Sequence, residues 1–365
     1  MRFPEFSGEW ETKSINDLAD VIGGGTPDTT VKSYWDGGIQ WFTPSEIGKN
    51  KFVDASLRTI TEDGLNNSSA KLLPPNTILL SSRATIGECS LSLRECATNQ
   101  GFQSLVSKKC NVDFLYYLIQ TKKKDLIRKS CGSTFLEISA NEVRKIQVSV
   151  PSDVEQQKIA GLLSLIDKRI ATQNKIIEKY ESLIKGIRNE IFGKLRKSIG
   201  FNAIVGDVLQ YEQPQSYIVE DTEYTNEGTP VLTANKAFVL GYTSDVDGIY
   251  DKGNCIIFDD FTLDCKYVDF PFKVKSSAIK ILTAKSNELL RYVYEFLKYL
   301  DLSTEEHKRH YIAETQNQGF ILPSTKTIKM VSHTFSALSL RLSSTVQLRN
   351  KYEAQKYHLL RQMFI

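Results

Sequence analysis

The feature that most constrains this chain is a run of isoleucines and leucines between positions 159 and 191. Together with Gln173 and Tyr180 they form a series whose steps alternate between four and three residues, which is the a and d spacing of a heptad repeat. Such a seam is narrow, so a helix that carries it must pack against another helix rather than in a broad core. We therefore predict a long helix over residues 152–199. Its predicted interface residues are Ile159, Leu163, Ile166, Ile170, Ile177, Tyr180, Ile184, Ile187 and Ile191.

A weaker seam in the same register lies 172 residues further along the chain. Lys179-Tyr180-Glu181 recurs there as Lys351-Tyr352-Glu353, and we interpret the two seams as an internal repeat. We predict a second long helix over residues 331–365, beginning near Val331, that pairs with the first. Its predicted interface residues are Phe335, Leu338, Leu342, Tyr352, Leu359 and Met363.

Length and composition are those of a two-domain globular protein. The chain has 365 residues, of which 41% are hydrophobic, and its formal net charge of +3 is too small to indicate nucleic-acid binding by itself. Six cysteines without a C-x-x-C pair, and no signal segment after Met1, favour a cytoplasmic protein. No apolar run approaches the roughly 20 residues that a transmembrane helix needs, so no membrane contact is expected.

Residues 1–151 and 200–330 carry strand and turn signals in the same order, which predicts two domains built on one plan. The predicted fold class is α+β, with two mixed, β-rich domains that contain short helices and are separated by the two long helices. The matched segments are 40–45 with 230–235, 78–81 with 255–259, and 114–119 with 289–300.

Two patterns have structural explanations that compete with functional ones. Gly23-Gly24-Gly25 lacks the spacing of a phosphate-binding loop, which favours a tight turn. His307 and His310 have no third metal ligand nearby in the sequence, which favours an exposed surface.

A third pattern leaves an enzymatic alternative open. Asp259, Asp260 and Asp264, followed by Lys266, have a loose nuclease-like spacing that could hold Mg²⁺ between carboxylates. The matched segment of the first domain carries Ser81 in place of an acid, which disfavours catalysis.

Five short motifs follow one another in the first half of the chain. They are Val21-Ile22-Gly23-Gly24-Gly25-Thr26-Pro27, Ile39-Gln40-Trp41-Phe42-Thr43-Pro44, Ile78-Leu79-Leu80-Ser81-Ser82-Arg83-Ala84-Thr85-Ile86-Gly87, Thr98-Asn99-Gln100-Gly101-Phe102, and Val150-Pro151 with Glu155-Gln156-Gln157-Lys158-Ile159. Each motif alone is weak, but five in this order are specific. With them the chain resembles, over essentially its whole length, the specificity subunit of type I restriction-modification systems.

The resemblance implies a non-catalytic subunit with two target-recognition domains, at 1–151 and 200–330. Each would read one half of a bipartite, asymmetric site in double-stranded DNA. The two long helices would be antiparallel, form an intramolecular coiled coil and hold the domains apart. Two methyltransferase subunits would dock on the helices and bring S-adenosylmethionine, while restriction subunits would bring ATP and Mg²⁺, so no cofactor or metal is expected on this chain itself.

Sequence reading in such domains comes from polar loop residues at base edges, and affinity comes from Lys and Arg on phosphates. Arg83 is the first candidate because its guanidinium can contact guanine through two hydrogen bonds. The predicted DNA contacts of the first domain are Thr43, Ser45, Ser82, Arg83, Thr85, Asn99 and Gln100, with Lys122, Lys123 and Lys124 as phosphate contacts. Those of the second domain are Thr233, Asn235, Lys236, Thr262 and Lys266.

Two other functions stay open on the sequence alone. A two-headed DNA-binding regulator would need no methyltransferase or translocase partner. A nuclease would use the three carboxylates at 259, 260 and 264, and would cut DNA without a partner subunit.

Overall fold

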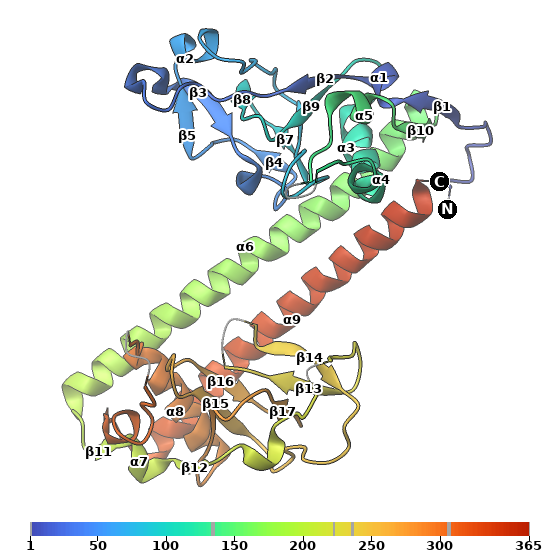
Figure 1. Ribbon diagram of the computed structural model, residues 1–365. Helices are drawn as coiled ribbons and strands as arrows, with labels where there is room; N and C mark the ends of the chain where they lie inside the picture. Colours follow the sequence, from blue (N-terminus) through green and yellow to red (C-terminus); the bar gives the residue numbers. More distant parts are fainter. Residues whose placement is uncertain (1, 133–135, 222, 235–236, 305–307, 365) are drawn as a thin grey trace. The chain divides into compact units, whose positions relative to one another are not determined.

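The computed structural model describes residues 2–132, 136–221, 223–234, 237–304 and 308–364. The chain divides into two compact units, which we describe separately (Figure 1). The first comprises Met1–Asn174 and Leu348–Ile365, and the second comprises Lys175–Gln347. Both long helices therefore contribute to both units, and each unit contains one β-rich domain. Among the described residues, no helix is apolar over enough of its length to cross a membrane.

The β-rich domain of the first unit is built from three small sheets. Their strand orders are β2-β9-β6-β7-β4, β5-β3-β8 and β1-β10. The strands are β1 (Glu11–Ser14), β2 (Ala19–Gly23), β3 (Trp35–Phe42), β4 (Phe52–Val53), β5 (Arg58–Ile60), β6 (Ile78–Leu80), β7 (Cys89–Ser92), β8 (Cys96–Thr98), β9 (Gln103–Ser107) and β10 (Gln147–Val150). The helices are α1 (Ile15–Leu18), η1 (Lys32–Tyr34), η2 (Pro44–Glu46), α2 (Glu62–Asn66), α3 (Val112–Thr121), α4 (Lys123–Arg128) and α5 (Ala140–Arg144).

The domain of the second unit follows the same plan with fewer strands. Its sheets have the orders β12-β18-β15-β16, β14-β13-β17 and β11-β19. The strands are β11 (Ala203–Ile204), β12 (Gln210–Glu212), β13 (Thr229–Leu232), β14 (Val239–Thr243), β15 (Cys255–Asp259), β16 (Cys265–Val268), β17 (Lys273–Val274), β18 (Ile279–Thr283) and β19 (Gly319–Phe320). The helices are α7 (Val205–Val208), η3 (Gln215–Tyr217), α8 (Asn287–Leu300) and η4 (Thr315–Asn317).

The two long helices are α6 (Asp153–Ser198) and α9 (Thr325–Met363), and they run antiparallel within each unit (Figure 1). In the first unit the beginning of α6 packs on the end of α9, in one core with Ile159, Leu163, Ile166, Ile170, Tyr352, Leu359 and Met363. In the second unit the end of α6 packs on the beginning of α9, in one core with Ile184, Ile187, Ile191, Phe335, Leu338 and Leu342. Between these two cores, Ile177 is buried and Tyr180 is half-buried. The predicted α+β class with two packed long helices is confirmed.

The second long helix begins at Thr325, six residues before the predicted start at Val331. Pro323 ends the preceding strand region, and the Ser324 hydroxyl accepts a hydrogen bond from the backbone N–H of Thr327 at 3.3 Å, which caps the first turn. Pro323-Ser324 stands 172 residues after Pro151-Ser152, so the repeat itself marks this start. The Glu155-Gln156 pair that follows Pro151 has no counterpart after Pro323, where Thr327 and Ile328 stand.

Each β-rich domain packs its main helix against the long helices. In the first unit α3 buries Phe114, Leu115, Leu118 and Ile119 in the core that α6 and α9 complete. In the second unit α8 buries Leu290, Val293 and Phe296 in the corresponding core. The apolar face of each helix is therefore covered by the long helices, which fixes the domain on them.

Candidate nucleic-acid interface

Three of the sequence motifs meet in the first domain, although they are far apart in the chain. The Gly25 N–H donates to the Thr98 carbonyl at 2.8 Å, and the Asn99 N–H donates to the Phe42 carbonyl at 3.1 Å. The buried indole of Trp41 donates to the Gly25 carbonyl at 2.9 Å. The segments after β2, β3 and β8 are therefore held together as one surface.

The glycine run is needed for close approach and not for a tight turn, which corrects the prediction. A Cβ atom on Gly24 would lie 2.1 Å from the Asn99 carbonyl oxygen, and one on Gly25 would lie 2.2 Å from the Ser69 hydroxyl. Neither glycine is among the residues with positive φ. A side chain at position 24 would push this segment away from Asn99, and one at position 25 would push it away from Ser69.

The loop after β6 joins the same surface. The Ser82 N–H donates to the Gly101 carbonyl at 2.8 Å, and the Ser82 carbonyl accepts from the Ile138 N–H at 3.1 Å. Within this loop Ala84 adopts a positive φ of 55°, which is uncommon for a residue other than glycine. The Arg83 guanidinium pairs with the Glu137 carboxylate at 2.8 Å, and both side chains are about two-fifths exposed.

The predicted residues of the first domain differ in how far they are accessible. Ser45, Thr85 and Gln100 are exposed, and Thr43 and Asn99 are half-buried. Asn99 and Thr43 are also engaged locally, because Asn99 accepts from the Gly101 N–H at 2.9 Å and Thr43 donates to Glu46 at 2.7 Å. Ser82 is fully buried beneath the loop.

The three consecutive lysines also differ from one another. Lys122 is half-buried at the junction of α3 and α4, and Lys124 is exposed. Lys123 pairs with Glu88 next to the loop after β6. In the second unit Lys298 pairs with Asp264 at 2.8 Å at the corresponding place, which indicates that this ion pair belongs to the shared framework.

The second domain repeats the hydrogen bonds that hold the first surface together. The Lys275 N–H donates to the Leu232 carbonyl at 3.2 Å, as Asn99 does to Phe42. The Asp260 N–H donates to the Ala278 carbonyl at 2.9 Å, and the Asp260 carbonyl accepts from the His310 N–H at 3.0 Å. These two bonds match those of Ser82. The loops at 261–263 and 83–87 therefore occupy equivalent places.

This equivalence shows where the predicted DNA-contacting residues of the second domain lie, and it brings two further residues to the same surface. Thr233 follows β13, Thr262 is exposed in the loop after β15, and Lys266 lies half-buried in β16. Asn235 and Lys236 lie outside the described residues, as does His307. Lys275 and Arg309, both exposed, stand at the places of Asn99 and Glu137. Sequence reasoning missed both because the intervening loops differ in length. His310 is buried, contrary to the surface position predicted for it.

The three carboxylates with nuclease-like spacing are used within the fold. Asp259 accepts from the N–H groups of Phe261 and Thr262, at 2.9 Å each, which closes the loop. Asp260 is buried and accepts from the Tyr311 N–H at 2.7 Å. Within the described part of the chain, no group of three His, Cys, Asp or Glu residues is placed to hold a metal ion.

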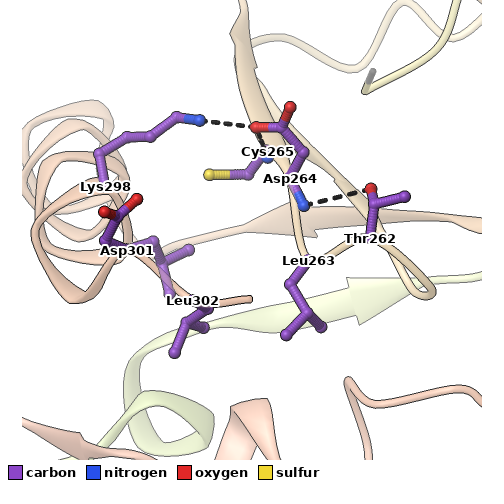
Figure 2. Close-up of a pocket in the computed structure, with 8 residues that line it drawn as sticks. Thr262, Leu263, Asp264, Cys265, Lys298, Asp301 and Leu302 are labelled. Atoms are coloured by element: carbon purple, nitrogen blue, oxygen red, sulfur yellow. Dashed lines mark hydrogen bonds and ion pairs between the residues drawn. The ribbon is translucent and has the colours of Figure 1, made fainter. Parts of the chain in front are cut away.

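The third of these carboxylates, Asp264, lines a pocket of about 450 Å³ between its loop and the end of α8 (Figure 2). Figure 2 shows Lys298 reaching across to Asp264, with Thr262 beside the Asp264 backbone. Burial raises the pKa of Asp264, but the hydrogen bond and charge of Lys298 outweigh it and hold the pKa below the usual value. The carboxylate is therefore an ion-pair partner of α8.

The first domain contacts the long helices through a buried polar network. The Lys51 ammonium, whose side chain is 8% exposed, pairs with Asp113 at 2.6 Å and donates to Ser164 of α6 at 2.8 Å. The Tyr117 hydroxyl donates to Asp167 of α6 at 2.5 Å, and Lys356 of α9 pairs with the same carboxylate at 2.8 Å. Burial and the negative charge of Asp167 raise the pKa of Tyr117, so its hydroxyl stays protonated.

The second domain uses a different network at the corresponding place. Glu295 of α8 is 1% exposed and pairs with Arg188 of α6 at 2.7 Å. It also pairs with Arg291 of its own helix at 2.8 Å. Arg291 in turn donates to the Phe335 carbonyl of α9 at 3.2 Å, so one carboxylate and two guanidinium groups join α8 to both long helices.

The sequence matches a known family model and several known proteins, all of one kind. A family model described as the type I restriction modification DNA specificity domain matches residues 7–182. The type I restriction enzyme MjaIX specificity subunit of Methanocaldococcus jannaschii is 32% identical over 305 residues, which cover 78% of this chain and 67% of that protein. The EcoR124I/EcoR124II specificity subunit of Escherichia coli is 38% identical over 164 residues, which are 40% of this chain and 41% of that protein.

Solved structures share the fold at low sequence identity. The S subunit of a type I restriction-modification system from M. genitalium superposes with a TM-score of 0.65 at 16% identity, covering 100% of this chain and 99% of that one. A chain from a study of complex assembly and conformational transition of the type I R-M system gives a TM-score of 0.52 at 11% identity, covering 98% of each chain. Both likenesses concern the fold.

Proposed function

Because the chain belongs to the specificity subunits of type I restriction-modification enzymes, we propose that its two β-rich domains each read one half of a bipartite, asymmetric DNA sequence. The observation that carries this proposal is the repeated frame of hydrogen bonds, which holds the loops around Ser82 and Asp260 in equivalent places. The side chains on these loops differ between the domains, as Arg83 and Phe261 do. Equivalent frames with different side chains suit two readers of different sequences.

Within each domain, the exposed polar and basic loop residues would contact the DNA. In the first, Arg83 would contact guanine, with Thr85, Ser45 and Gln100 beside it. Thr43 and Asn99 would shape the loops as well as contact bases, and Lys122, Lys123 and Lys124 would contact phosphates. Ser82 would act by supporting Arg83 from below, since it is buried. In the second domain the proposed contacts are Thr233, Asn235, Lys236, Thr262 and Lys266.

The helix pair would set the number of unread base pairs between the half-sites. The 46 residues of α6 correspond to about 69 Å at the rise of an α-helix. A paired helix resists bending, so its length would fix the distance between the two readers and hence the phase of the two grooves. The proposed division is 1–151 for the first reader and 200–324 for the second, which ends where α9 begins and not at the predicted 330, with the long helices between and after the readers.

The partners follow from the same proposal. The chain itself is not catalytic. Two methyltransferase subunits would bind the long helices and carry S-adenosylmethionine, and restriction subunits that use ATP and Mg²⁺ would complete the complex. The complex would act in the cytoplasm, where the DNA is. A stand-alone regulator would have no use for such partners, and family membership disfavours it.

The spacing proposal is tested by inserting seven residues after Asn174 in α6 and seven after Gln347 in α9 of the full chain. One heptad lengthens a helix by about 10.5 Å, or about three base pairs, and nearly restores the seam. Methylation mapping in a host that carries the methyltransferase partner should show both half-sites unchanged and a spacer longer by about three base pairs. An unchanged spacer would refute the proposal that the helix pair sets the spacing. If the complex with the wild-type chain showed no sequence-specific methylation, the proposed function itself would be refuted.

A further inference from the structure

The equivalence of the two domains shows which residue of the first domain corresponds to Arg309 of the second. Ile138 and His310 donate from their N–H groups to the carbonyls of Ser82 and Asp260, at 3.1 and 3.0 Å. The residues immediately before these donors, Glu137 and Arg309, therefore stand at equivalent positions beside the loops.

The charges at this place are distributed differently. In the first domain the loop supplies Arg83 and the neighbouring segment supplies Glu137, which pairs with it at 2.8 Å. In the second domain the loop supplies Phe261 and the neighbouring segment supplies Arg309. Each domain thus has one guanidinium at this place. In the first domain it comes from the loop, and in the second it comes from the neighbouring segment. Among the described residues, Arg309 has no acidic partner.

The backbone beneath Arg309 is fixed. The Asp260 carboxylate is 1% exposed and accepts from the N–H groups of His310 and Tyr311, at 3.0 and 2.7 Å. The buried Lys280 ammonium lies 3.4 Å from the same carboxylate. An exposed cation on an anchored backbone is suited to meet a charged ligand with little loss of conformational freedom.

A second cation stands on the same frame. Lys275 is exposed where the first domain has the neutral Asn99, and its segment is tied to Asp260 through the bond to Ala278. The second domain therefore presents two cations where the first presents one arginine that is neutralised by its own acid. Two exposed cations that have no acidic partner within the described part of the chain, and that stand on one hydrogen-bonded frame, point to a polyanionic ligand.

We propose that Arg309 contacts DNA from the second domain, at the position that the Arg83–Glu137 pair occupies in the first. The inference rests on the proposed function and adds to it a DNA contact that the sequence did not predict. Asp260 acts as a positioning residue, since it holds the backbone of 310 and 311 beneath the arginine.

The test uses the full chain with its methyltransferase partner and duplexes that carry the mapped recognition site. Arg309→Ala should weaken binding to the intact duplex by roughly five- to 150-fold if it contacts a base. If it contacts a phosphate, the slope of log K against log salt should instead become shallower by about 1. The loss from a base contact should be absent on a duplex whose second half-site is scrambled, whereas the change from a phosphate contact should appear on both duplexes. Lys285→Ala, which removes an exposed cation between β18 and α8 and outside both long helices, is the matched control.

The outcomes separate the inference from the function on which it rests. If Arg309→Ala binds the intact duplex as tightly as the wild type with the same salt slope, the inference is wrong. An equal loss with Lys285→Ala would also overturn it, because the effect would then be one of net charge. If the wild type binds intact and scrambled duplexes alike, the proposed function fails instead. Unchanged thermal melting of both variants shows that the fold is retained.

Discussion

The two units fasten their β-rich domains to the same helix pair with different buried polar groups. In the first unit the domain supplies the hydroxyl of Tyr117, which donates to the acid Asp167 of α6. It also supplies Lys51, which pairs with Asp113 of its own domain and donates to Ser164 of α6. In the second unit the domain supplies the acid Glu295, and α6 supplies the cation Arg188. The apolar packing around both networks follows one plan.

This difference teaches that the internal repeat preserves the backbone and the apolar contacts but not the buried polar partners. A buried charge that lacks its partner is strongly destabilising, so each domain is matched to its own end of the helices. The domains are therefore alike in fold but are not interchangeable at their junctions. Four predictions test this comparison.

The largest effect is expected for Glu295→Gln. The substitution keeps the shape but leaves Arg188 and Arg291 without a counter-charge in a buried site, which should cost about 3–5 kcal/mol of unfolding free energy. Urea denaturation followed by circular dichroism measures it. As a control, Glu190→Gln breaks an exposed ion pair between Glu190 and Lys194, both on α6, and should leave the unfolding free energy unchanged. Equal effects of the two variants would contradict the role of burial.

In the first unit, Tyr117→Phe should cost less than Glu295→Gln. It removes the hydrogen bond to Asp167 at 2.5 Å, but Lys356 still pairs with that carboxylate, so we expect a loss of about 1–2 kcal/mol. Adding Lys356→Met should cost more than the sum of the two single changes, because Asp167 would then lose both partners. Strict additivity in the double-mutant cycle would show that the residues do not act as a network.

At the DNA surface, Arg83→Ala should relax one base of the first half-site at a cost of about 1–3 kcal/mol and leave the second half-site unchanged. Glu137→Gln, which releases Arg83 from its ion pair, should strengthen binding to sites with a mismatch in the first half-site. Competition binding with base-substituted duplexes measures both. A uniform loss over all sequences with Arg83→Ala would indicate a phosphate contact.

The smallest effect concerns the ion pair that both domains share. The folded-state pKa of Asp264 lies below the unfolded value of about 3.9, so its contribution is present above that pH and is lost as the pH falls through the folded pKa. Because the pair is partly exposed, the contribution should be below about 1 kcal/mol. The difference in unfolding free energy between wild type and Asp264→Asn should therefore be constant near pH 7 and shrink below about pH 4. A difference that grows on acidification would contradict this assignment.

The sequence predicted the parts of the molecule that depend on periodicity and local signals. The a and d seam from Ile159 to Ile191 predicted the long helices, because burial of a narrow apolar stripe leaves few alternatives. The buried junction was not predicted, since Lys51 and Ser164 are 113 positions apart and neither has an unusual local context. Arg309 was missed for a related reason: only the hydrogen bond of His310 to Asp260 shows which loop it accompanies.

The first unit takes its core from both ends of the chain, since Phe364 lies against Phe114 with ring centroids 5.2 Å apart and Met363 is buried in the same cluster. During synthesis the first β-rich domain leaves the ribosome long before these residues exist. Its helix α3 must then keep an apolar face uncovered while about two hundred further residues are made, which is a period of exposure to aggregation. The domain that is translated first is thus the one whose core closes last.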